Sequence, residues 1–199
     1  RNAAQPMGES DLWSGSLEPT NEPYAVAKLA GLSMVQSFRR QYGRHYITVI
    51  PTNLYGPGDH YFTTDSHVVA SMMGRFHLAK TNNTSAEPVW GSGTPRREFM
   101  FVDDAADAII FLIKNYDDDE AINIGGGESV SIKELAQIVA ETVGYKEEIK
   151  FDREKPDGMP LKALDNGKLN QFGWQQRTSF RSGIKITYAD YVQALKSKK

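Results

Sequence analysis

Short apolar runs alternate with longer amphipathic stretches along most of this chain. Apolar residues at helical spacing predict helices over 21–42, 66–80, 103–116 and 182–195, another opening at 131, and a helical turn over 169–174. Short runs rich in β-branched or aromatic residues predict strands over 46–50, 88–90, 97–102, 120–124 and 148–151. Because strands and helices alternate, we expect an α/β fold with a mostly parallel sheet.

The first predicted helix has clear end signals and one apolar stripe. Asn21 is a plausible N-cap, Pro23 falls in the first turn, and Gly43 is expected to end the helix. The stripe consists of Leu29, Leu32, Val35, Phe38 and Tyr42. This spacing supports the assignment of a helix.

Two later helices carry their own start signals. We expect Asp103 to cap the helix over 103–116 and Ser131 to form a capping box with Glu134. Residues 1–20 and 155–165 look like irregular loops. Residues 51–58 are expected to form a loop at the carboxyl end of a strand, which is where ligands bind in open α/β sheets.

Tyr24 and Lys28 stand four residues apart at the start of the first predicted helix. Positions i and i+4 share one helix face, so the two side chains should project the same way. A phenol, with an ordinary pKa of about 10, is a poor acid–base catalyst at pH 7, but a nearby ammonium group favours the phenolate. The pair is therefore a candidate general acid/base, although this short motif also occurs often by chance.

Composition excludes several classes of function. The net charge of −2 gives no sign of attachment to nucleic acid or to an anionic membrane, and no apolar run approaches the roughly 20 residues of a membrane span. The chain has no cysteine, so neither disulfides nor thiolate chemistry can arise within it. Its four histidines show no metal-ligand spacing, and we expect no metal site and a cytoplasmic location.

Several runs together resemble the extended short-chain dehydrogenase/reductases that act on nucleotide sugars. These runs are 5–7, 17–28, 41–44, 51–57, 66–68, 89–95, 97–99, 102–104, 155–158 and 169–174. The resemblance implies the later part of a Rossmann-type doubly wound sheet plus a smaller α/β substrate-binding domain. It would assign 1–56 and 97–126 to the NADP-binding domain, and 57–96 and 127–199 to the nucleotide-sugar-binding domain.

The resemblance also implies a reaction and its catalytic residues. A 4-keto sugar is epimerised at C3 and C5 and then reduced at C4 by hydride from NADPH. Tyr24 matches the proton donor to the C4 oxygen, and Lys28 matches the residue that activates it and binds the nicotinamide ribose. His67 matches an epimerisation acid/base, although a lone histidine is more often structural. The remaining three histidines are expected to be surface or packing residues.

Two sets of binding residues follow from the same resemblance. The NADP(H) set consists of Tyr24, Lys28, Pro51, Thr52, Asn53, Leu54 and His67. The set for a GDP-sugar consists of Arg75, Trp90, Arg97 and Asp157. Arginine suits a diphosphate because its planar fork makes paired, charge-assisted hydrogen bonds. Each member of the second set, taken alone, would look like core or solvated surface.

The part of the family pattern that holds the cofactor phosphates is not found in this sequence. That phosphate-binding part is a Gly-rich turn between a strand and a helix. The Ser and the Cys that the family carries shortly before the region matching Arg1 are also not found, and the resemblance makes that Cys the epimerisation partner of His67. Gly125 to Gly127 lacks the spaced pattern and is explained as a turn. We therefore expect the later portion of a longer enzyme, unable to bind NADPH tightly by itself, with an open sheet edge and an uncovered apolar face.

Two departures from the family leave alternatives open. Gly58-Asp59-His60-Tyr61 follows Pro57, and Leu161 stands where the family usually has arginine, which puts the substrate in question. The chain could belong to another nucleotide-sugar epimerase or dehydratase, although His67 with Trp90 and Arg97 speaks against it. It could also be a truncated, non-catalytic nucleotide-sugar-binding or dimerisation module. The family resemblance implies a homodimer, with the Tyr24 helix near the interface.

Overall fold

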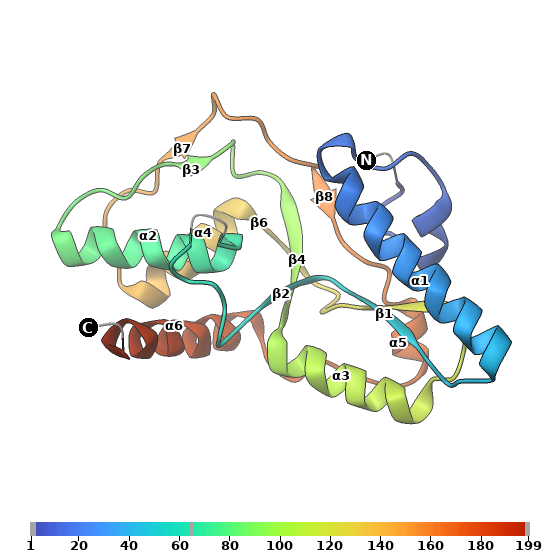
Figure 1. Ribbon diagram of the computed structural model, residues 1–199. Helices are drawn as coiled ribbons and strands as arrows, with labels where there is room; N and C mark the ends of the chain where they lie inside the picture. The colour runs from blue at the N-terminus through green and yellow to red at the C-terminus, as the bar shows by residue number, and fades with distance from the viewer. Residues whose placement is uncertain (1–2, 64–65, 198–199) are drawn as a thin grey trace.

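The structure, a computed structural model, describes residues 3–63 and 66–197 of the chain. Two groups of elements lie on either side of the central strand β4 (Arg96–Phe101), as Figure 1 shows. One group contains α1 (Glu22–Tyr42), β1 (Thr48–Pro51), α3 (Val102–Asn115), β5 (Ala121–Ile124) and α5 (Gly167–Gln171). The other contains α2 (Val68–Asn82), β3 (Val89–Trp90), α4 (Ile132–Val143), β7 (Phe151–Asp152) and α6 (Phe180–Ser197). The predicted α/β fold is confirmed.

The strands pair mostly in parallel, as the alternating pattern predicts. β1 pairs with β5 from Thr48 opposite Ala121 to Pro51 opposite Ile124, and β3 pairs with β7. The central strand β4 runs parallel to β2 (Asn53–Tyr55) and β8 (Leu161–Lys162) and antiparallel to β6 (Ser129–Ser131). β4 therefore connects the two groups of elements.

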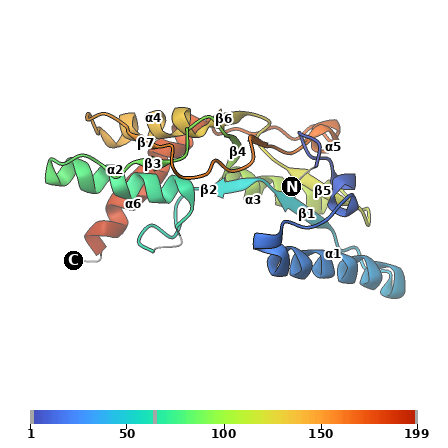
Figure 2. The ribbon, with the colours of Figure 1, turned by 90° about the horizontal axis from the view of Figure 1, so that it is seen from above.

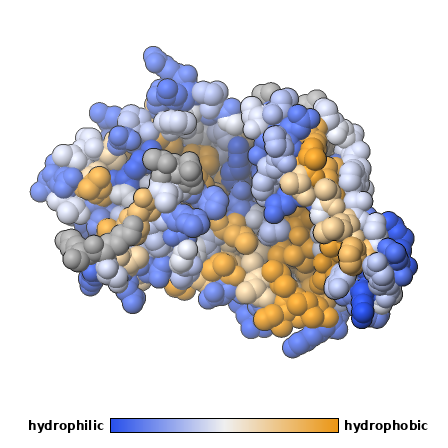
Figure 3. Space-filling view, viewed as in Figure 1, coloured by the Kyte–Doolittle hydropathy of each residue, from blue (hydrophilic) through white to orange (hydrophobic). Residues whose placement is uncertain are grey.

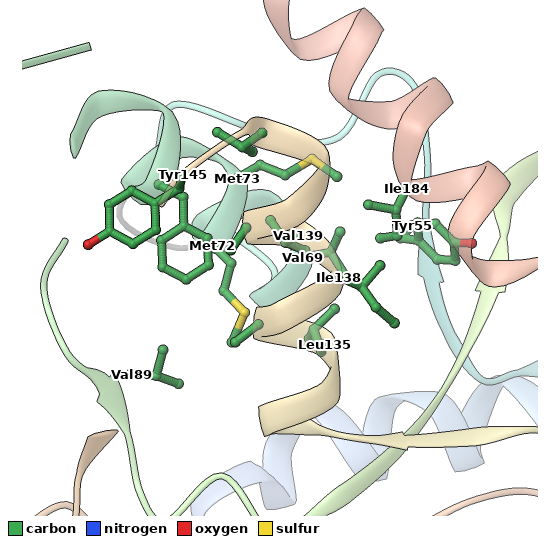
Figure 4. Close-up of a cluster of buried hydrophobic side chains, with 14 of the residues drawn as sticks. Tyr55, Val69, Met72, Met73, Val89, Leu135, Ile138, Val139, Tyr145 and Ile184 are labelled. Atoms are coloured by element: carbon green, nitrogen blue, oxygen red, sulfur yellow. The ribbon is translucent and has the colours of Figure 1, made fainter. Parts of the chain in front are cut away.

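Alternation along β4 divides the core into two main clusters. Phe99 and Phe101 point into a cluster between α2, α4 and α6, part of which is shown in Figure 4. Met100, between them in sequence, packs instead with the side chains of α3 and β5. Period-two alternation of a strand explains this division. The side chains of β4 thus contribute to both clusters.

The group that contains β1 leaves much of its apolar surface uncovered. Figure 2 shows α1 along one side of the molecule, and Leu32 is its buried residue. Phe38 and Tyr42 of the predicted stripe are 43% and 55% exposed. Figure 3 shows further apolar surface over β1 and α3, and among the described strands β1 pairs with β5 alone. An open edge and an uncovered apolar face are present, as the sequence predicts.

Several predicted helix ends are confirmed. Asn21 is the residue before α1, and Gly43 ends it with a left-handed φ of 61°. Ser131 and Glu134 form the predicted capping box, in which Ser131 Oγ accepts from the Glu134 N–H and the Glu134 carboxylate accepts from the Ser131 N–H. The remaining boundaries move by one to three residues from the sequence pattern, as is usual for element ends.

Two details of the sequence prediction are wrong. Residues 51–58 are not all loop, because β2 forms within them through pairing of Leu54 with Met100 and Tyr55 with Phe101. Asp103 does not cap α3. The helix begins one residue earlier, with Phe101 at the N-cap, so Asp103 lies in the first turn. β6 and β8, three and two residues long, were also not predicted, because tertiary pairing rather than local sequence creates them.

Close packing explains the run of glycines after β5. A Cβ added to Gly125 would lie 2.2 Å from Glu98 Oε1 and 2.9 Å from Asn166 Nδ2. Glu98 cannot swing away freely, because Oε1 accepts from the Gly127 N–H and Oε2 accepts from the Leu164 N–H. The turn predicted from these glycines is confirmed, and its glycine at 125 makes room for a buried carboxylate.

We expect Gly125→Ala to lower the free energy of unfolding by about 1–3 kcal/mol, as overpacking of a tight site does. Thermal and urea unfolding measure the change. Gly31→Ala is the matched control, since a Cβ at Gly31 in α1 would meet nothing within 4 Å. Equal stability of the two variants would contradict this account.

Candidate active site at the junction of the two groups

Tyr24 and Lys28 lie on one face of the first two turns of α1. The Lys28 Nζ stands over the Tyr24 ring, 5.3 Å from its centroid, and Tyr24 is 60% exposed. Pro23 fits the start of the helix because its missing N–H needs no partner there. The i, i+4 geometry predicted from the sequence is therefore present, with the phenol hydroxyl available to a ligand.

A cavity of about 540 Å³ opens beside Tyr24, where β1 ends and the chain crosses to β2. It is lined by most of the residues predicted to bind the cofactor: Tyr24, Pro51, Thr52, Asn53, Leu54 and His67. These residues come from α1, from the β1–β2 segment and from the start of α2. The structure thus brings together segments that lie up to 43 positions apart in the sequence.

The backbone carbonyl of Glu98 in β4 fixes the part of the wall formed by Thr52 and Asn53. Both side chains donate to the backbone carbonyl of Glu98, Thr52 Oγ1 at 3.1 Å and Asn53 Nδ2 at 2.7 Å. The Glu98 side chain is itself fully buried and also accepts from Asn166 Nδ2 at 3.0 Å. β4 therefore holds the cavity wall in place through both its backbone and its core side chain.

His67 is the N-cap residue of α2 and projects into the same cavity. Its side chain is 72% exposed, and its Nδ1 lies 3.3 Å from Asp59 Oδ1. The other histidines differ: His77 Nδ1 lies 2.8 Å from the Tyr188 hydroxyl, and burial lowers the pKa of this imidazole. His45 pairs with Asp117 on the surface. Of His45, His67 and His77, only His67 lines the cavity.

The four residues predicted to hold the GDP-sugar do not line this cavity; they surround β3 and the segment 157–159. Arg97 Nη1 donates to the Met159 carbonyl at 2.6 Å. Asp157 accepts from the Ser92 N–H at 2.8 Å and from its hydroxyl at 2.7 Å, and these bonds lower the pKa of the Asp157 carboxyl. Trp90 is 72% exposed, with Lys155 over its ring.

Arg75 and Arg97 are partly buried cations that form no close ion pair among the described residues, although the charge of Glu87 acts on Arg75. Burial lowers the pKa of each guanidinium group. Arg75 donates to the Pro88 carbonyl at 3.3 Å, while its buried Nε has no hydrogen-bond partner among residues 3–63 and 66–197. Two such cations near one exposed indole can accommodate an anion next to a flat ring.

One strand connects the two sets of residues. In the β4–β8 pairing Arg97 lies opposite Lys162, and Lys162, Ala163 and Leu164 line the cavity. The N-terminal segment covers the same stretch, since Met7 donates to the Ala163 carbonyl and also lines the cavity. Figure 3 shows the surface hollowed between the two groups of elements. A ligand longer than the cavity could therefore extend from Tyr24 toward Arg97.

Comparison with known proteins agrees with this arrangement. Residues 1–125 match the NAD dependent epimerase/dehydratase family. The chain belongs to this family. It is 47% identical over 197 residues to "Probable GDP-L-fucose synthase 1" of Oryza sativa subsp. japonica, covering 99% of this chain and 60% of that protein. It is 46% identical over 200 residues to "GDP-L-fucose synthase" of Escherichia coli (strain K12), covering 96% and 62%.

A solved structure gives the same picture. A GDP-L-fucose synthetase from Naegleria fowleri bound to NADP matches with a TM-score of 0.92 and 27% identity, over 98% of this chain and 63% of that one. The chain spans about 60% of the length of the curated relatives it matches. The Rossmann-type fold of these epimerases and reductases is therefore shown for the part of the family represented here.

Two residues beside the family's expected site were not predicted to be functional. Lys162 lines the cavity, although only Leu161, the residue before it, was singled out from the sequence. Asp59 contacts His67, although it was noted only as part of a departure from the family. In both cases the signal was a charged residue next to a family motif, in a segment too short to predict as an element.

Neither a metal site nor a membrane-spanning helix is found among the described residues. No three acidic or histidine side chains in ranges 3–63 and 66–197 gather closely enough to hold a metal ion. In the same ranges, no helix combines the length and apolar character that crossing a bilayer requires.

Proposed function

We propose that this chain is the later part of a GDP-L-fucose synthase, which epimerises GDP-4-keto-6-deoxy-D-mannose at C3 and C5 and reduces it at C4. The observation that carries the proposal is one cavity lined by Tyr24, His67 and the segment 51–54. Family membership and relatives named GDP-L-fucose synthase support it. The 4-keto group acidifies the neighbouring C–H bonds and later accepts hydride, so it makes both steps possible.

Tyr24 and Lys28 are proposed to act at C4. The Tyr24 hydroxyl would give its proton to the oxygen that becomes an alkoxide, and Lys28, whose Nζ stands over the Tyr24 ring, would bind beside it. His67 would exchange protons with the carbons beside the ketone, because imidazole titrates near neutral pH. Both Tyr24 and His67 line one cavity, which supports the proposal that they act on one sugar ring.

NADPH is the proposed cofactor, and it supplies the hydride. The residues present fit its nicotinamide end, because the cavity lies at the carboxyl end of parallel strand β1 and is lined by Tyr24, His67 and residues 51–54, with Lys28 beside the Tyr24 ring but outside the lining. No spaced Gly-rich phosphate turn occurs in the sequence. We propose that the phosphates are held by residues of the full-length protein outside this chain.

The GDP part of the substrate is proposed to lie along Arg75, Trp90, Arg97 and Asp157. The unpaired, partly buried guanidinium groups support a diphosphate, and the exposed face of Trp90 supports a flat base or ring. The two core clusters support division into a cofactor part (1–56 and 97–126) and a substrate part (57–96 and 127–199). The division is not strict: Leu169 and Trp174 of the substrate part pack in the cluster of Met100, α3 and β5, and Tyr55, Phe99 and Phe101 of the cofactor part pack in the other cluster.

A homodimer with α1 near the interface and a cytoplasmic location also belong to the proposal. The exposed apolar side chains Met34 and Phe38 on α1 support the dimer. Sedimentation velocity of the full-length protein tests this proposal. A monomer at all concentrations would exclude the homodimer.

The proposed activity is tested with the full-length gene product that contains this chain. GDP-4-keto-6-deoxy-D-mannose and NADPH are supplied, loss of NADPH absorbance is followed, and the product is identified by NMR. Formation of GDP-L-fucose is expected. A product reduced at C4 without inversion at C3 or C5 would favour another reductase of the family, and GDP binding without NADPH consumption would favour the non-catalytic binding module.

Arg97→Gln in that protein is expected to weaken GDP binding about 10- to 100-fold, since one charge-assisted hydrogen bond contributes about 1.5–3 kcal/mol. Isothermal titration calorimetry measures the change. Arg181→Gln is the matched control, because Arg181 is an exposed arginine paired with Glu141 on α4. Equal GDP affinity of the two variants would remove Arg97 from the substrate site.

A further inference from the structure

A carboxylate that does not line the cavity contacts His67. Asp59 Oδ1 lies 3.3 Å from His67 Nδ1 and accepts from the His60 N–H at 2.7 Å. The Asp59 side chain is 8% exposed, and it is not among the described residues that line the cavity. Its Oδ2 is buried without a hydrogen-bond partner in the described chain. Asp59 therefore faces His67 rather than a ligand.

Helix α6 holds the turn that presents Asp59. Asp190 Oδ2 accepts from the Tyr61 hydroxyl at 2.8 Å and from the Gly58 N–H at 2.9 Å. Burial, together with Asp190 and Asp59, raises the pKa of Tyr61, so its hydroxyl keeps the proton that it donates. The Tyr61 N–H in turn donates to the Asp59 carbonyl at 2.9 Å. Gly58, directly before Asp59, and Tyr61, two positions after it, are thus both hydrogen-bonded to Asp190 of α6.

The contact selects one form of the imidazole ring. An ionised carboxylate only accepts hydrogen bonds, so the nitrogen that faces it must carry a proton. With Nδ1–H committed to Asp59, Nε2 is the nitrogen left for the cavity that His67 lines. In the neutral ring Nε2 then has a free lone pair, and in the charged ring it has a proton to give.

We propose that Asp59 is a positioning residue that holds His67 as the Nδ1–H tautomer and directs Nε2 to the substrate carbon. This proposal rests on the proposed function. When Nε2 takes a proton from the carbon beside the ketone, the electron pair of the C–H bond passes into the enolate. The imidazolium that forms keeps its Nδ1–H bond to Asp59 and holds the abstracted proton on Nε2, and inversion is completed when a second acid of the full-length protein protonates the enolate carbon on its opposite face.

Histidine NMR tests the contact without any turnover. The full-length protein is labelled with ¹⁵N-histidine, and the His67 resonances are assigned by their loss in His67→Gln. We expect a protonated Nδ1 in the wild type and a shift toward a mixture of tautomers in Asp59→Asn. Asp119→Asn, an exposed aspartate beside Arg40 of α1, is the matched control and should change nothing. Unchanged His67 shifts in Asp59→Asn, or equal shifts in the control, would overturn the proposal.

A double-mutant cycle tests the effect on proton exchange at C3 and C5. Asp59→Asn is expected to slow deuterium uptake at least about 10-fold, within the range that general acid–base catalysis supplies, and to leave GDP affinity unchanged. In the His67→Gln background the same change should cost nothing further, because Asp59 acts through His67. An equal loss in both backgrounds would overturn the proposal. If the wild type takes up no deuterium, the proposed function fails, and the tautomer measurement still decides the role of Asp59.

Discussion

Tyr24→Phe in the full-length protein should remove reduction almost completely while the substrate still binds. The variant loses only the hydroxyl; the ring that Lys28 covers at 5.3 Å remains. General acid catalysis contributes about 10²–10⁴-fold, and we expect NADPH consumption with GDP-4-keto-6-deoxy-D-mannose to fall by that factor. Stopped-flow absorbance measures the hydride step, and calorimetry with GDP measures binding.

The control for this change lies on the same helix. Tyr42→Phe removes a hydroxyl at the other end of α1, where the side chain is 55% exposed and does not line the cavity. It should reduce at the wild-type rate. Near-normal NADPH consumption by Tyr24→Phe would contradict the role of Tyr24 as proton donor, whatever the control shows.

The relation between Tyr24 and Lys28 could be predicted from the sequence because it is local. Asn21, Pro23 and Gly43 mark the ends of α1, and helical geometry alone places positions i and i+4 together. The same holds for the capping box of α4. In each case the residues that decide the structure lie within one or two turns of one another, so no knowledge of the fold is needed.

The cavity itself could not be predicted from local pattern. Part of its wall is formed by β2. The sequence of this segment is typical of a turn, because Gly56, Pro57 and Gly58 follow shortly after Asn53. Pairing with β4, more than 40 residues later, makes that segment a strand. Lys162 reaches the cavity in the same way, through a two-residue strand that exists only because it pairs with β4.

Family resemblance supplied what pattern alone could not, but it did not supply contacts. It named His67 as an acid/base without indicating what orients the ring, since Asp59 lies eight positions earlier in a turn held by Asp190 of α6. It also grouped Arg75 and Trp90 with Arg97, and none of these three residues lines the cavity beside Tyr24: Arg97 bonds to Met159, Arg75 bonds to Pro88, and Trp90 lies in β3. The β4–β8 pairing connects these residues to the cavity, because it places Arg97 opposite Lys162.

His67→Gln in the full-length protein is expected to slow deuterium uptake at C3 and C5 by about 10²–10⁴-fold, the usual contribution of general acid–base catalysis. Glutamine can still hydrogen-bond to Asp59, but it cannot take up or release a proton near pH 7. GDP affinity should change little, because the predicted GDP contacts surround segment 157–159 and not His67. NMR of the sugar ring in deuterated water measures uptake at each carbon.

The matched control is His45→Gln, which alters an exposed histidine paired with Asp117, away from the cavity. It should exchange at the wild-type rate. If His67→Gln loses exchange at one carbon only, His67 serves one face of one epimerisation, and the other centre requires a different base. Unchanged uptake at both carbons would remove His67 from acid/base chemistry, because no other property of glutamine could restore proton transfer at this position.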